Sequence, residues 1–199
     1  MAGNIVVIGS SNTDMIVQTP WIPKPGETIL GGTFSTAPGG KGANQAVAAA
    51  RAGGNVSFIA RVGTDMFGDQ AVEGFRRDGI DTSGVLRDES APSGVALIIV
   101  DEHGENSIAV APGANALLTP DDIHRMKYTL TSASVILMQL EIPMETVTVA
   151  AEIGAHAGVP VILNPAPAQK PDNNLLRDIT LLTPNETEAE LLTLSLIHI

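Results

Sequence analysis

The sequence predicts a three-layer α/β/α fold with a mainly parallel central sheet, from which a small β-sheet projects. From residue 135 onward, apolar runs typical of buried strands alternate with helical segments, which is the rhythm of a parallel sheet with helices on its faces. Two further groups of β runs, at about 27–36 and 95–111, contain no helix between partners. Because parallel strands need long crossover connections, we assign these groups to the separate projecting sheet.

The first half of the chain supplies two strands and two helices to the main layers. The opening strand is a continuous apolar run that ends in Gly-Ser-Ser-Asn, which is typical of a strand buried on both faces. A glycine-rich turn then leads into an alanine-rich helix, which a Gly-Gly pair closes. In chain order these elements are a strand at 4–9, a turn at 38–42, a helix at 43–52, a strand at 56–62 and a helix at 66–78.

Turn and capping signals divide the second half. The polar segment 101–106 separates two β runs as a hairpin turn does. Thr119 is an N-cap candidate, because Pro120 follows at the first helical position and Asp121 and Asp122 lie in the first turn. The later elements are a helix from Thr119 to about residue 130, a strand at 135–140, a helix at 144–156, a strand at 159–163, a linker, a strand at 179–182 and a helix opened by Pro184.

Composition excludes several classes of function. The net charge of −11 repels phosphate backbones and anionic lipids, so neither nucleic acid nor a membrane surface is an expected partner. No apolar run approaches the length of a membrane span, and the start lacks the basic region of a signal peptide. There is no cysteine, which suits a reducing cytoplasm, and the four histidines fit no metal-ligand spacing. We therefore expect a cytoplasmic protein.

Polar side chains follow the predicted strands at the ends where ligands bind in open α/β sheets. They are Asn12, Asp14, Gln139, Glu141, Asn164, Asn185 and Glu188. Because the carboxyl ends of parallel strands share one edge of the sheet, we expect these groups to converge on a crevice.

The segment Gly39-Gly40-Lys41-Gly42-Ala43-Asn44 is the sharpest local signal. Its glycines allow a ligand to approach the backbone, the following helix start offers free N–H groups, and Lys41 and Asn44 add side-chain donors. An ordinary loop with a solvated lysine is the alternative. The segment is neither a Walker A loop nor a dinucleotide fingerprint, because Gly42 follows the lysine and the first strand lacks G-x-G-x-x-G.

Three other groups have a ligand-binding interpretation and a structural one. Asn12-Thr13-Asp14 suits a polyol, or forms an Asx-turn that caps local amides. Glu141 points into the crevice, or adds a charge to the first turn of the next helix. Asn185 and Glu188 order a metal and phosphates, or are ordinary residues of a helix start. Spacing alone leaves each pair of alternatives open.

As an ordered set, the motifs resemble the ribokinase/phosphofructokinase-B family of carbohydrate kinases. The resemblance extends from residue 4 to residue 193. It rests on Gly9-Ser10-Ser11-Asn12-Thr13-Asp14, Pro25-Gly26-Glu27-Thr28, Gly39-Gly40-Lys41-Gly42-Ala43-Asn44-Gln45-Ala46, Arg61-Val62-Gly63-Thr64-Asp65, Ser93-Gly94-Val95-Ala96, Met138-Gln139-Leu140-Glu141, Asn164-Pro165-Ala166-Pro167-Ala168 and Thr183-Pro184-Asn185-Glu186-Thr187-Glu188.

The resemblance implies a kinase that transfers the γ-phosphate of ATP to O5 of D-ribose, with Mg²⁺ and, as a frequent activator, K⁺. The projecting sheet becomes a lid over the sugar and the contact of a homodimer. Glu141 holds the sugar from the side opposite the lid. The other implied sugar-site residues are Asn12, Thr13, Asp14, Gly40, Lys41, Gly42, Ala43 and Asn44. Asn185 approaches the nucleotide phosphates, and Glu188 helps to order magnesium.

The sequence also departs from the family pattern. The Gly-Ala-Gly-Asp segment that carries the family's catalytic base does not occur in it. We therefore interpret 1–193 as the N-terminal two-thirds of one ribokinase-like domain, and 194–199, Leu-Ser-Leu-Ile-His-Ile, as a non-native tail. We expect no catalysis from this chain alone. Two alternatives stay open: a deoxyribokinase or another pentose kinase, and a non-catalytic sugar-binding protein on the same fold.

Overall fold

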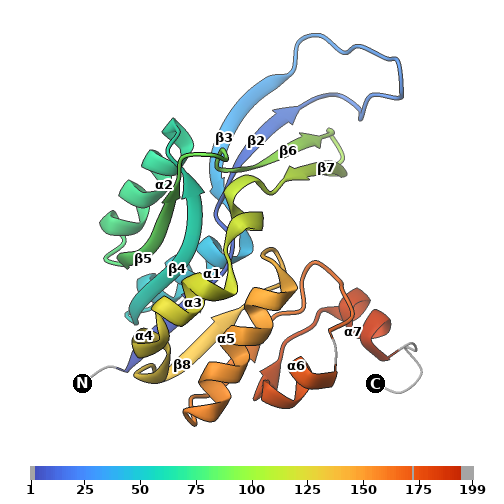
Figure 1. Cartoon of the computed structure of the whole chain (residues 1–199). Helices are drawn as coiled ribbons and strands as arrows, with labels where there is room; N and C mark the ends of the chain where they lie inside the picture. The colour runs from blue at the N-terminus through green and yellow to red at the C-terminus, as the bar shows by residue number, and fades with distance from the viewer. Residues whose placement is uncertain (1–2, 172, 194–199) are drawn as a thin grey trace.

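A parallel sheet forms the centre of the molecule. The computed structural model describes residues 3–171 and 173–193 (Figure 1). Within these residues the sheet has six strands in the order β10-β9-β8-β1-β4-β5, and every neighbouring pair is parallel. The strands are β1 (Asn4–Ile8), β4 (Asn55–Gly63), β5 (Asp81–Asp88), β8 (Val135–Met138), β9 (Val161–Leu163) and β10 (Leu181–Leu182). The predicted parallel sheet is confirmed.

Helices cover both faces of this sheet, as the alternation of side chains along β1 shows. Val7 packs in a cluster with Ala43 and Phe75, from α1 (Lys41–Arg51) and α2 (Met66–Arg77). Val6 and Ile8 point to the opposite face and pack with the helices of the second half of the chain. Those helices are α3 (Pro120–Arg125), α4 (Lys127–Thr131), α5 (Met144–His156) and α6 (Asn173–Asp178), and α7 (Glu186–Thr193) follows β10. The three-layer prediction is confirmed.

A second, four-stranded sheet projects from the first (Figure 1), and we call it the lid sheet. Its strand order is β3-β2-β6-β7, with antiparallel outer pairs and a parallel β2–β6 pair at the centre. The strands are β2 (Asn12–Gln18), β3 (Thr33–Gly39), β6 (Gly94–Val100) and β7 (Asn106–Ala111). The predicted hairpin at 95–111 is thus confirmed, whereas the strand expected at 27–36 begins only at Thr33.

Other boundaries differ from the sequence-based expectations. The helix predicted from Thr119 is confirmed at its start, where Thr119 and Asp122 form a capping box. It breaks at Met126, whose amide donates to the carbonyls of both Asp122 and Ile123, so that α3 and α4 are separate helices. The strand expected at 135–140 ends at Met138.

Four of the described elements were not predicted at all: β2, β5, α6 and the short 3₁₀ helix η1 (Gly113–Leu117). The β5 sequence, Asp-Thr-Ser-Gly-Val-Leu-Arg-Asp, has weak intrinsic β-propensity, and it becomes a strand by pairing with β4. The sequence predicted a linker where α6 forms, although Leu175 of this helix is fully buried against the core. The proposed tail at 194–199 lies outside the described residues. Among the described helices, none is both long and apolar enough to cross a membrane.

Candidate ligand-binding site beside the lid sheet

The carboxylate of Glu141, which follows β8, connects three segments of the chain. Its Oε2 accepts hydrogen bonds from the Ser10 hydroxyl at 2.6 Å and from the Lys41 backbone amide at 3.0 Å. Its Oε1 lies 3.8 Å from the Lys41 ammonium. Ser10 belongs to the connection between β1 and the lid strand β2, and Lys41 is the first residue of α1. Glu141 therefore fixes the glycine-rich turn against the root of the lid sheet.

Two glycines make this close approach possible. Gly40 has φ of +90°, and a Cβ built there would lie 2.8 Å from the Asn12 amide nitrogen. A Cβ on Gly42 would lie 2.6 Å from the carbonyl carbon of Gly9 and from the nitrogen of Ser10. Since real Cβ atoms do not approach so closely, any larger residue would push α1 away from β1. The turn predicted at 38–42 is thus the end of β3 followed directly by the helix.

Asn12 is anchored by a residue that sequence reasoning did not identify. Asn115, in the short 3₁₀ helix η1 (Gly113–Leu117), donates to Asn12 Oδ1 at 2.8 Å and accepts from the Ser11 amide at 2.9 Å. Both asparagine side chains are buried. The contact spans 103 positions of the sequence, and no local pattern marks Asn115, so only the folded chain reveals it.

Asp14 lies two residues further along β2, so its side chain points to the same face of the lid sheet as that of Asn12. Its carboxylate packs against the Cα of Gly39 on the neighbouring strand β3. No described residue donates a hydrogen bond to this carboxylate. Burial, and then the nearby charge of Glu141, raise the pKa of Asp14 above its ordinary value. Asp14 is therefore an acceptor whose capacity the described part of the chain leaves unused.

Thr13 points away from the carboxylates of Asp14 and Glu141, because consecutive strand residues face opposite sides of the sheet. It lines a groove of about 670 Å³ between the lid sheet, α1 and α2. Both the groove and the Asp14–Glu141 carboxylates adjoin the glycine-rich turn, but the carboxylates lie outside the groove. The groove also takes in the candidate residues Asn12, Ala43 and Asn44, whereas Asp14, Lys41 and Glu141 do not line it.

Gln139, expected at the crevice, is buried instead, whereas Asn164 lies at the carboxyl end of β9 as expected and also has a structural partner. Gln139 is fully buried beneath α1, where its Nε2 donates to Gln45 Oε1 at 2.6 Å. The Asn164 amide donates to the Thr183 carbonyl at 2.8 Å. Asn185 and Glu188 form a reciprocal capping box at the start of α7, in which each backbone amide donates to the other's side chain at 2.8 Å. Both interpretations of this last pair remain compatible with the fold, since one Glu188 oxygen and the Asn185 amide nitrogen are not used in the box.

This architecture belongs to the α/β proteins that bind small molecules beyond the carboxyl ends of their strands. Comparison with family models identifies residues 2–197 as a pfkB family carbohydrate kinase. The chain belongs to this family.

Curated relatives and solved structures agree with that assignment. The chain is 44% identical over 193 residues to a ribokinase of Haemophilus influenzae, covering 97% of this chain and 63% of the relative. It is 42% identical over 191 residues to a deoxyribokinase of Salmonella typhi, covering 96% and 62%. The structure of Arabidopsis thaliana ribokinase complexed with ribose and ATP superposes with a TM-score of 0.85 at 36% identity, covering 97% of this chain and 63% of that one. The chain thus spans about three-fifths of the length of the relatives it matches.

Proposed function

We propose that the chain is the sugar-binding part of an enzyme that phosphorylates D-ribose at O5 with ATP. The observation that carries the proposal is the pair of carboxylates, Asp14 from the lid sheet and Glu141 from the central sheet, on either side of the glycine-rich turn. Carboxylates that keep acceptor capacity suit a ligand rich in hydroxyl groups. The similarity to a ribokinase solved with ribose and ATP supports this choice of ligand.

In the proposed complex, Asp14 accepts hydrogen bonds from two ribose hydroxyls, and Asn12, oriented by Asn115, adds an amide donor. Glu141 and Lys41 bind the sugar from the other side, and Gly40 lets it approach the backbone. Asn44, in the first turn of α1, lines the adjoining groove together with Asn12, and we propose it as a further donor to the sugar where the groove meets the glycine-rich turn. These contacts position the nucleophilic hydroxyl, which is the main requirement of phosphoryl transfer. The family's Gly-Ala-Gly-Asp segment is absent from the 199 residues, so we expect binding without turnover.

The proposed cofactors are ATP and Mg²⁺, with K⁺ as activator. Asn185 and Glu188 offer amide and carboxylate groups at a helix start, and both types suit phosphate and magnesium. Among the described residues, no cluster of three or more acidic or imidazole side chains could hold a metal by itself. A magnesium ion at Asn185 and Glu188 would take its remaining ligands from water and the nucleotide phosphates.

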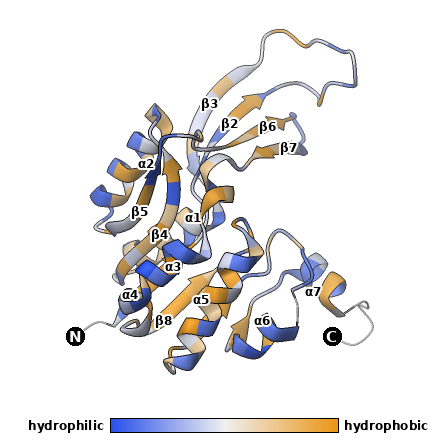
Figure 2. Ribbon diagram, viewed as in Figure 1, coloured by the Kyte–Doolittle hydropathy of each residue, from blue (hydrophilic) through white to orange (hydrophobic). Residues whose placement is uncertain are grey.

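A homodimer through the lid sheet belongs to the same proposal. The lid strands carry half-exposed apolar side chains on both faces of the sheet, with Phe34 and Leu97 on one face and Ile108 and Val110 on the other. Figure 2 shows hydrophobic residues along β6 and β7. Exposed apolar side chains such as Phe34 and Leu97, on the face of the lid sheet opposite Asp14, suit contact with a second copy of the chain. Light scattering on Leu97→Asp, which should be monomeric where the parent is dimeric, tests this arrangement.

Deoxyribose is the second candidate sugar, because a deoxyribokinase is nearly as similar as the ribokinase. The two sugars differ by one hydroxyl, and Asn12 is a residue that could sense it. Calorimetric titration with D-ribose and with 2-deoxyribose separates the candidates. A site that hydrogen-bonds the additional hydroxyl should bind ribose at least about tenfold more tightly.

The decisive test of sugar binding is Glu141→Gln in the full chain. Loss of the charge removes a charge-assisted acceptor from the proposed site, so ribose affinity should fall about 10- to 100-fold. The matched control is Glu145→Gln, an exposed residue of the first turn of α5, which should leave affinity unchanged. Equal affinity of Glu141→Gln and the parent would contradict the proposal, and ribose-dependent ADP release by the 199-residue chain would contradict the expected lack of turnover.

A further inference from the structure

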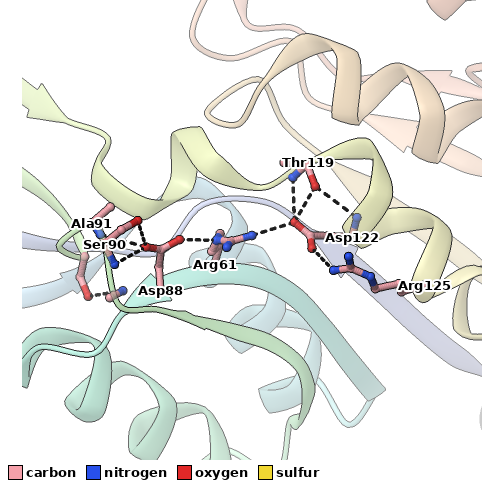
Figure 3. Close-up of polar contacts among 9 residues, drawn as sticks. Arg61, Asp88, Ser90, Ala91, Thr119, Asp122 and Arg125 are labelled. Carbon is pink, nitrogen blue, oxygen red and sulfur yellow. Dashed lines mark hydrogen bonds and ion pairs between the residues drawn. The ribbon is translucent and has the colours of Figure 1, made fainter.

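Arg61, near the end of β4, forms the centre of a buried ionic cluster away from the sugar-site candidates (Figure 3). Its Nε donates to Asp88 Oδ2 at 2.7 Å, and its Nη1 donates to Asp122 Oδ2 at 2.9 Å. The two carboxylates are 4% and 3% exposed. One planar guanidinium therefore joins two acidic residues that come from different parts of the chain, a geometry that a lysine cannot reproduce.

Each carboxylate organises one of the two connections of the β6–β7 hairpin. Asp88 ends β5 and accepts from the amide and hydroxyl of Ser90 and from the amide of Ala91, which shapes the segment that enters β6. Asp122 accepts from the amide and hydroxyl of Thr119, which ends the segment that leaves β7. Arg61 thus binds the entrance and the exit of the hairpin to the same point of the central sheet.

The two connections also contact each other and lead to the candidate site. The Ala114 amide donates to the Pro92 carbonyl at 2.8 Å, which ties the exit segment to the entrance segment. One residue further along, Asn115 holds Asn12 and Ser11. Gly94, the first residue of β6, pairs with Asn12 in the lid sheet. A displacement of either connection would therefore move the anchor of Asn12.

We propose that Arg61 is a positioning residue that fixes the orientation of the β6–β7 hairpin and, through Asn115 and Asn12, the lid side of the sugar site. Arg61 does not touch the ligand in this proposal. It acts by holding both hairpin connections at one end of β4. The part that concerns sugar affinity rests on the proposed function, whereas the part that concerns hairpin orientation does not.

Two readouts test the proposal in the full chain. The sequence has no cysteine, so a cysteine introduced at a chosen position is the only site that a thiol-reactive spin label modifies there. His103→Cys in the hairpin turn and Glu152→Cys on α5 place one label on each element at exposed positions. Double electron–electron resonance measures the distribution of distances between the two labels, which reports the orientation of the hairpin. Calorimetry measures ribose affinity. In Arg61→Gln we expect a broader distance distribution and about tenfold weaker ribose binding. Arg125→Gln is the matched control, because Arg125 forms an ion pair with Asp122 but does not bridge to Asp88, and its side chain is largely exposed. This variant should change neither readout.

Arg61→Lys separates positioning from simple charge neutralisation. Lysine keeps the positive charge, so this variant should retain most of the stability that Arg61→Gln loses, yet it should still broaden the distance distribution because it cannot bridge both carboxylates. Restoration of both readouts by lysine would overturn the proposal, as would an unchanged distribution in Arg61→Gln. Failure of both variants to fold would also overturn it, by assigning Arg61 to fold stability. If the parent binds no ribose, the proposed function fails, while the spin-label distances still decide the role of Arg61.

Discussion

Two pairs of carboxylates in this molecule have opposite environments. Asp88 and Asp122 each accept four hydrogen bonds from described residues, including those from Arg61. Asp14 accepts none from the described part of the chain, and Glu141 keeps an oxygen whose nearest cation is 3.8 Å away. Carboxylates that hold the fold are thus saturated with donors, whereas those at the proposed sugar site retain acceptor capacity for a ligand.

The pKa of Asp14 moves in the opposite direction from the pKa values of Asp88 and Asp122. The Ser90 hydroxyl, and then Arg61, hold the pKa of Asp88 well below its ordinary value. Burial acts to raise the pKa of Asp122, but the hydrogen bonds from Thr119 and the charges of Arg61 and Arg125 lower it overall. The pKa of Asp14 is raised. The fold therefore favours ionisation of the two carboxylates in the Arg61 cluster and disfavours ionisation of Asp14.

The largest expected effect comes from removing Asp122, one of the two carboxylates that bind Arg61. Asp122→Ala removes the capping box of α3 and leaves the Arg61 charge without one of its partners, so the free energy of unfolding should fall by about 3 kcal/mol at pH 7. Urea denaturation followed by circular dichroism measures it. The neighbouring exposed residue gives the control, since Asp121→Ala should cost less than about 0.5 kcal/mol. A similar cost for both variants would show that the Arg61 cluster contributes no special stability.

The Asp122 contribution should also depend on pH in a defined direction. Because the folded-state pKa of Asp122 lies below the unfolded value of 3.8, its stabilisation is present above pH 3.8 and is lost as the pH falls through the folded pKa. The difference between the parent and Asp122→Asn should therefore shrink on acidification below pH 3.8. A difference that grows on acidification would contradict the assigned direction.

A smaller effect tests what positions the proposed site. Its turn is held by close packing of glycines, so Gly42→Ala should destabilise the protein by about 2 kcal/mol and weaken ribose binding. Gly74→Ala provides the matched control in α2, where a Cβ would meet no atom within 4 Å. There the substitution should stabilise by about 0.5–1 kcal/mol, because alanine favours the helix. Thermal unfolding of both variants measures the difference in sign.

The smallest effect comes from neutralising Asp14 at the proposed sugar site. The raised pKa of Asp14 means that the folded state binds a proton more tightly than the unfolded state, so the parent loses stability as the pH rises above 3.8. Asp14→Asn avoids this loss and should be slightly more stable than the parent at pH 7, because solvent screening keeps the effect small, with almost no difference at about pH 3.5. Urea titrations at the two pH values measure it. A less stable variant at pH 7 would show that Asp14 serves the fold, and unchanged ribose affinity would remove it from the proposed site.

Much of the fold could be predicted because local signals and tertiary contacts agree. The apolar run of β1, the alanine-rich sequence of α1 and the cap at Thr119 all indicate the elements that form. β2 and β5 were missed because neither is a continuous apolar run. β2 is only partly buried along most of its length and is defined by pairing with β3 and β6, which the local sequence does not reveal.

Some residues of the candidate site could also be predicted from local sequence, whereas others depend on partners far away in the chain. The glycine-rich turn and Glu141 carry signals within a few residues, and the structure brings them together. Asn115 and Ser10 act through partners more than 100 positions away, and Arg61, although part of a quoted motif, gives no sign of its two carboxylate partners. Gln139 was misplaced because its type suits a crevice, while the packing of α1 on the sheet buries it completely.

The central β2–β6 pairing of the lid sheet has a consequence for the order of folding. The outer pairs are antiparallel, whereas β2 and β6 join Asn12 to Gly94 across an intervening stretch that contains α1, β4, α2 and β5. Closing so long a loop is entropically costly until the intervening elements have formed. We therefore expect the lid sheet to assemble after the central sheet. Sugar binding would then appear last during folding and would report that the described part of the chain has reached its native arrangement.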